Sequence, residues 1–98
     1  EERARYFRAL VSNALGDPAQ ALEDAEKALA VIGAHGPRPL DTALLHLARA
    51  AAMRAIGDEN GRSRAIADAD AAAAALTAPG LQTQFAAQRA NVVASWEL

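Results

Sequence analysis

Apolar residues recur along the chain at the three- and four-residue spacing of amphipathic helices. Over residues 2–15 this spacing predicts a first helix, which Gly16 ends. Asp17 is a suitable N-cap, and Pro18 suits the first helical position because the N–H that it lacks would have no helical partner there. A second helix is therefore expected to run from Pro18 to Gly33. Its expected buried residues are Ala21, Leu22, Ala25, Ala28, Leu29 and Ile32.

A third helix is predicted in the middle of the chain. Two glycines and two prolines within residues 33–41 predict a loop, and Asp41 or Thr42 is expected to cap the helix that follows. This helix continues to about Ile56 and is apolar over more than half of its circumference, so it needs neighbours on two sides. Its expected buried residues are Leu44, Leu45, Leu47, Ala48, Ala51, Ala52, Ala55 and Ile56.

Two more helices are predicted towards the end of the chain. The segment GDENGR, residues 57–62, is interpreted as a polar turn, and a fourth helix is expected from about Ser63 to Leu76. A proline and a glycine close it, and a fifth helix begins at about Leu81. The whole pattern predicts a single all-α domain over residues 1–98, with about five antiparallel helices.

The composition indicates a broad and shallow core. Hydrophobic residues make up 52% of the 98 residues but aromatic residues only 4%, so the apolar content is mostly alanine with some leucine. Alanine is the best helix former, yet each buried methyl group contributes only about 0.8 kcal/mol. We therefore expect a thin margin of stability.

Charge and residue usage exclude several classes of function. A formal net charge of −2 provides no clustered basic surface for nucleic acid. The sequence has no cysteine for a disulfide or thiolate metal site, and no apolar run approaches the length of a membrane helix. The expectation is a soluble, cytoplasmic protein without direct nucleic-acid or membrane contact. Because the chain starts without methionine and its last residues keep a helical pattern, we expect it to be a piece of a longer protein.

The two halves of the chain are similar to each other. The Leu-Gly-Asp of residues 15–17 is matched by the Ile-Gly-Asp of residues 56–58, a shift of 41, and the alanine-rich helix beyond is matched at a shift of 44. The second copy therefore has three extra residues in its turn. A period of this kind is typical of stacked helix pairs, each too small to bury its apolar face alone.

The turn at residues 16–17, followed by alanine at positions 21, 25 and 28 and by Leu29, resembles the turn and second helix of a tetratricopeptide repeat. In that family the turn glycine lets two helices reverse, and small residues on the second helix let its neighbours pack closely. The resemblance covers nearly the whole chain. The repeats are a degenerate form of the family pattern, because Arg8 and Arg49 fall in or beside the position where the first helix of each repeat has a Leu-Gly-like pair. Similar divergent repeats follow DNA-binding or ATPase domains in bacterial regulators.

The resemblance implies an α-solenoid of antiparallel helix-turn-helix repeats. Repeat one would span about residues 2–33, repeat two about residues 41–77, and a final helix about residues 81–97. Such a scaffold implies a non-catalytic protein–protein interaction module that binds a peptide or a partner helix.

No motif in the sequence carries evident catalytic chemistry. His35 in the Gly/Pro loop and His46 on the third helix are each expected to make a surface or interhelical hydrogen bond. Asp68 and Asp70 lie two residues apart on a helix, so they point about 200° apart and cannot chelate one ion. Nucleophile elbows, phosphate-binding loops and dinucleotide turns are absent from the sequence. We expect no enzymatic activity, cofactor or metal.

The first helix carries the best candidate for partner binding. Arg5 and Arg8 share one face, while Tyr6 and Asn13 lie together on an adjacent strip. Two guanidinium groups are therefore expected beside an aromatic ring and an amide. Arg49 repeats Arg8 in the second half. This set suits an acidic or carboxylate-bearing peptide. The alternative is that these arginines pair with the glutamates at the start of the chain or with a neighbouring repeat.

The fifth helix carries the second candidate surface. Phe85, Val92 and Trp96 share one of its faces and either cover the open end of the preceding helix pair or form an interface. The interface would contact further domains of a parent chain, a second copy in a homodimer, or a partner. Two alternatives to peptide binding stay open: a small-molecule signal-sensing domain of a bacterial regulator, and a purely structural or dimerisation element.

Overall fold

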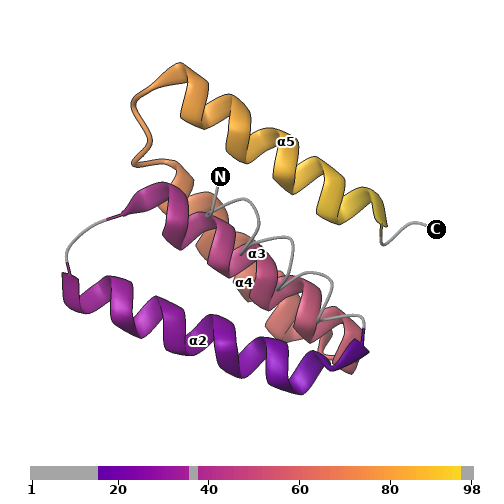
Figure 1. The fold of residues 1–98 in the computed structure, drawn as a ribbon. Coiled ribbons are helices and arrows are strands. Elements are labelled where there is room, and N and C mark those ends of the chain that lie inside the picture. Colours follow the sequence, from indigo (N-terminus) through magenta and orange to yellow (C-terminus); the bar gives the residue numbers. More distant parts are fainter. Residues whose placement is uncertain (1–15, 36–37, 96–98) are drawn as a thin grey trace.

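The computed structural model describes residues 16–35 and 38–95, which form a bundle of helices (Figure 1). No strand occurs among these residues, so the all-α prediction is confirmed for this part of the chain. The predicted first helix, residues 2–15, lies outside the described residues. No helix in the described part is long and apolar enough to cross a membrane. The four described helices are α2 (Pro18–His35), α3 (Pro39–Ile56), α4 (Glu59–Ala73) and α5 (Pro79–Ser95).

The start of α2 follows the predicted cap. The backbone N–H of Gln20 donates to Asp17 Oδ1 at 3.2 Å, and Pro18 occupies the first helical position. The helix continues past Gly33 to His35, two residues further than predicted. The physical reason is that Gly33 does not adopt the positive φ with which a glycine ends a helix.

The start of α3 differs from the prediction. Pro39 lies in its first turn, and Arg38 occupies the N-cap position without a side-chain hydrogen bond to the helix. The prediction that Asp41 or Thr42 caps this helix is therefore wrong. Proline presets the helical φ and needs no partner for a backbone N–H, so the helix begins there. Asp41 lies inside the first turn, with Oδ2 3.5 Å from Arg38 Nη1.

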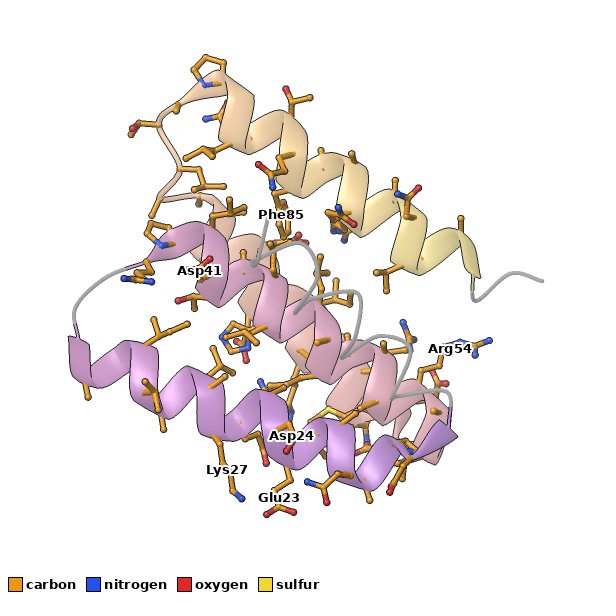
Figure 2. The ribbon with its side chains drawn as sticks, in the orientation of Figure 1. Glu23, Asp24, Lys27, Asp41, Arg54 and Phe85 are labelled. Carbon is orange, nitrogen blue, oxygen red and sulfur yellow. The ribbon has the colours of Figure 1, made fainter. Side chains whose placement is uncertain are left out.

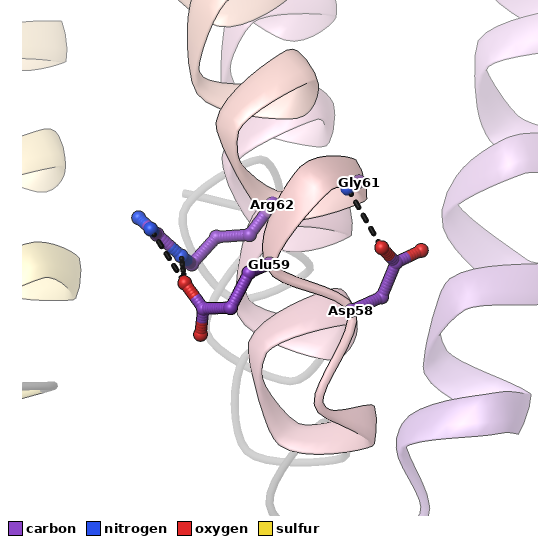
Figure 3. A network of polar contacts seen from close by, with 4 residues as sticks. All are labelled: Asp58, Glu59, Gly61 and Arg62. Atoms are coloured by element: carbon purple, nitrogen blue, oxygen red, sulfur yellow. Dashed lines mark hydrogen bonds and ion pairs between the residues drawn. The ribbon is translucent and has the colours of Figure 1, made fainter.

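The connection between α3 and α4 is much tighter than predicted. Gly57 ends α3 in the left-handed conformation, with φ of 95°, and Asp58 caps α4 by accepting a 2.8 Å hydrogen bond from the Gly61 N–H (Figure 3). Arg62 Nη2 lies 2.7 Å from Glu59 Oε2 in the same turn. The interpretation of GDENGR as a turn that precedes the fourth helix is wrong, because most of this segment is the first turn of α4.

The helix α3 lies at the centre of the described bundle. It packs along α2 on one side and α4 on another, and it makes a smaller contact with α5 (Figure 1). The expectation of neighbours on two sides is confirmed. Two residues that we expected to be buried, Ala55 and Ile56, are exposed at the end of the helix. Its buried residues are Leu40, Ala43, Leu44, Leu45, Leu47, Ala48, Ala50, Ala51 and Ala52.

The core is built mainly from alanine. On the helices that flank α3, Ala21 and Ala25 of α2 and Ala65 and Ala69 of α4 are almost inaccessible to solvent. Leu47 is the one large side chain in the described residues that is buried completely. The larger apolar residues of α2 lie at the margin of the core and are partly buried: Leu22, Leu29 and Ile32.

Candidate functional site

A polar cluster joins the three packed helices at Arg49 of α3. Its guanidinium lies between two acidic residues, with Nε 3.8 Å from Glu26 Oε2 of α2 and Nη1 3.7 Å from Asp68 Oδ2 of α4. Nη1 is also 3.0 Å from Nδ1 of His46, one turn earlier on α3. The arginine side chain is 18% exposed, whereas both carboxylates are 55% exposed. We call Glu26, His46, Arg49 and Asp68 the Arg49 cluster.

The surroundings of His46 in the Arg49 cluster favour its neutral form. Burial lowers the pKa of His46 below its usual value, the nearby positive charge of Arg49 lowers it further, and Asp68 partly offsets both effects. A neutral imidazole can accept the hydrogen bond from Arg49 at Nδ1, whereas an imidazolium has no acceptor. The cluster is therefore suited to holding three helices together.

Asp70 takes part in a second polar contact between helices. Its two oxygens accept hydrogen bonds from Arg89 of α5, at 2.8 Å from Nε and 3.1 Å from Nη2. This hydrogen bonding raises the pKa of Arg89. Asp68 faces α3 while Asp70 faces α5, so the two carboxylates diverge as their spacing predicts. Each of them pairs with an arginine of another helix.

A cleft of about 270 Å³ lies where the start of α3 meets the connection between α4 and α5. It is lined by residues 38–41, residues 75–78 and Leu81. Its walls are mainly apolar, because they include Leu40, Leu76 and Leu81. Leu40 and Leu76 are buried, and Leu81 is 37% exposed. Arg38 is the most exposed charge at its edge, at 64%. We call this space the corner cleft.

Most of the predicted partner-binding residues lie outside the described part of the chain. Arg5, Tyr6, Arg8 and Asn13 lie outside the described residues, and so does Trp96 of the second candidate surface. Of that predicted binding set, Arg49 alone is described, and its contacts with α2 and α4 correspond to the pairing alternative rather than to an open binding surface.

The two described residues of the predicted apolar face of α5 are buried. Phe85 is 6% exposed and Val92 is 4% exposed, and both belong to the main core cluster. Figure 2 shows Phe85 pointing from α5 towards α3. This is the arrangement expected of a helix that covers the preceding helix pair.

Sequence reasoning missed two of these polar contacts, one within α3 and one between α4 and α5. The hydrogen bond between His46 and Arg49 follows from their three-residue spacing on one helix, so that signal was available. The pairing of Asp70 with Arg89 has no comparable signal, because the two residues are 19 positions apart.

The described residues contain no arrangement of His, Asp and Glu side chains that would hold a metal ion. Arg49 and Arg89 pair with carboxylates of neighbouring helices, whereas the other printed ion pairs join residues three or four positions apart. Comparison of the chain with models of protein families, with curated proteins and with solved structures found no match in any of the three.

Proposed function

We propose that the chain is a non-catalytic protein-interaction module with a tetratricopeptide-like scaffold, part of a larger regulatory protein, that binds a peptide or a partner helix. The observation that carries the proposal is the packing around α3. It contacts the helix before it, the helix after it and, beyond that, α5. In a stack of helix pairs, the first helix of each pair makes these three contacts: one with the second helix of its own pair and one with each neighbouring pair.

The use of charge in the described bundle also supports a binding scaffold. Arg49 and Arg89 connect helices to one another, and this rigidifies the stack without assembling a nucleophile, base and acceptor at one place. A preformed stack of helices binds an extended or helical ligand with little loss of its own conformational entropy. The ligand we expect is an acidic or carboxylate-bearing peptide at Arg5, Tyr6, Arg8 and Asn13.

A selection from a displayed library of random peptides tests this proposal. We expect the selected peptides to be acidic, and we expect Arg5→Gln and Arg8→Gln each to weaken their binding about tenfold while the melting temperature stays within 2 °C, roughly the effect of less than 1 kcal/mol. Arg64→Gln is the matched control, because it removes the same charge from an exposed residue of α4 that has no polar contact within the described residues. Unchanged affinity together with a lowered melting temperature would mean that these arginines are structural.

The corner cleft favours a second function, small-molecule sensing. Its volume of about 270 Å³ is close to the lower end of ligand pockets in proteins, which begin at about 300 Å³. Its apolar walls and the charges of Arg38 and Asp41 would suit a small ligand with an apolar body and one polar end. A thermal-shift screen of metabolites, repeated with Leu81→Glu to fill the cleft with a charge, distinguishes this function from peptide binding.

A further inference from the structure

One asparagine in the sequence is followed by glycine, and this Asn60-Gly61 pair lies in the first turn of α4. Asn60 is exposed, and its side chain makes no polar contact with another described residue. Asparagine is chemically labile, because the backbone nitrogen of the next residue can attack its side-chain carbonyl carbon. Glycine in the next position favours the attack, since no Cβ stands in its way and its backbone turns freely. The other two asparagines precede Ala14 and Val92, so Asn60 is the most reactive of the three.

The reaction needs water and no other reagent. The Gly61 nitrogen bonds to Cγ of Asn60, the side-chain nitrogen takes up the proton that Gly61 loses and leaves as ammonia, and a succinimide ring forms. Water then opens the ring at either of its carbonyl carbons. Attack at Cγ gives aspartate with the normal main chain, whereas attack at the main-chain carbonyl carbon gives isoaspartate. Neither step oxidises or reduces the chain.

The first turn of α4 holds the attacking nitrogen away from this reaction. The Gly61 N–H donates a 2.8 Å hydrogen bond to Oδ1 of the capping Asp58 (Figure 3). The Arg62 N–H donates to the Asp58 carbonyl oxygen at 2.9 Å, so the backbone is helical around Gly61. Ring closure needs the Gly61 nitrogen in one plane with Cα, Cβ and Cγ of Asn60, which helical dihedrals do not provide. The reaction therefore requires this turn to open, and the end turns of helices open at low cost.

We propose that Asn60 is a deamidation site protected by the Asp58 cap, and that isoaspartate at this position loosens the contact between α3 and α4. Aspartate would keep the helix, because a negative charge is favourable in the first turn. Isoaspartate lengthens the main chain by the Cβ carbon between residues 60 and 61. The resulting displacement meets α3, since a Cβ on Gly61 would already lie 2.7 Å from Met53 Sδ. The modification does not depend on the peptide binding proposed above.

Peptide mapping by mass spectrometry, after incubation of the full chain in mildly alkaline buffer, tests the protection. We expect Asn60 to be modified at least about fivefold more slowly in the folded chain than in urea that unfolds it. Asp58→Ala should speed the modification in the folded chain about fivefold, the factor that corresponds to the usual worth of an N-cap. Asp58→Asn, which keeps an acceptor oxygen, should stay within about twofold of the wild type. Asp17→Ala is the matched control, because it removes the cap of α2 and leaves the start of α4 unchanged.

The structural consequence is measured on the separated products. The isoaspartate form, isolated by chromatography, should unfold at a lower urea concentration than the fresh chain, whereas Asn60→Asp should match the fresh chain. Asn60→Gln, which does not readily close such a ring, should show no change on incubation. Absence of modification in urea, no gain in rate with Asp58→Ala, or an equal gain with Asp17→Ala refutes protection by the cap. An isoaspartate form that unfolds like the fresh chain refutes the effect on the contact between α3 and α4.

Discussion

Arg49→Ala should destabilise the chain by about 2–3 kcal/mol, although arginine is a residue usually found on surfaces. The hydrogen bond to His46 is worth about 1 kcal/mol net, and each pairing with a half-exposed carboxylate about 0.2–1 kcal/mol. The remainder is the packing of an aliphatic stem whose side chain is only 18% exposed. For a domain of this size the change corresponds to a melting temperature about 10–20 °C lower.

Urea unfolding followed by the helical circular dichroism signal measures this loss. Arg49→Met keeps most of the stem packing but loses the hydrogen bond and both pairings, so its loss should be smaller than that of Arg49→Ala by about 0.5–1 kcal/mol. Arg64→Ala on the exposed face of α4 should stay within about 0.5 kcal/mol of the wild type. If Arg49→Ala behaves like Arg64→Ala, the Arg49 cluster does not hold the helices together and the reasoning is wrong.

Three further predictions concern single residues. The pKa of His46 is lowered in the folded chain, so as the pH falls below the usual histidine value of 6.5 the unfolded chain binds more protons than the folded chain. The free energy of unfolding therefore decreases as the pH is lowered. His46→Gln should reduce this loss of stability between pH 7.5 and pH 5.5, measured by urea unfolding. Gly57→Ala should lower the free energy of unfolding by about 1–2 kcal/mol because Gly57 has a φ of 95°, whereas Gly33→Ala inside α2 should raise it by about 0.5–1 kcal/mol. An added methyl group meets open space at both positions, so equal effects of the two substitutions would contradict the backbone explanation. Asp58→Ala should cost about 1 kcal/mol through loss of the α4 cap, and Asp58→Asn, which keeps an acceptor oxygen, should restore most of it in the same unfolding assay.

The sequence alone determined where several helices begin and end. The cap at Asp17 and the break at Gly57 are local events, because an N-cap depends on residues three positions apart and a left-handed turn on a single φ. The apolar spacing of α3 predicted its burial for the same reason, since a helical period is set by the residues themselves. The all-α class and the central position of α3 followed from these signals.

At the start of α4, where local prediction failed, the chain lies close to another helix. Gly61 argued against helix at the start of α4, yet an added Cβ there would lie 2.5 Å from Asp58 Oδ2 and 2.7 Å from Met53 Sδ of α3. A Cβ at position 61 would therefore force the Asp58 and Met53 side chains to shift, a constraint that no helix propensity records. The exposure of Ile56 has a similar origin, because the tight connection to α4 turns the chain before a neighbour can cover that side chain.

The candidate site depended even more on tertiary structure. The partners of Arg49 lie 23 positions before it and 19 positions after it, and Arg89 meets Asp70 over a separation of 19. The sequence supplied both charges of each pair and the faces on which they lie. Which charges meet depends on how α2, α4 and α5 cross α3, and those crossings follow from the packing of many alanine side chains together. Pairing across helices is therefore a property of the assembled fold, whereas the helices themselves are a property of the local sequence.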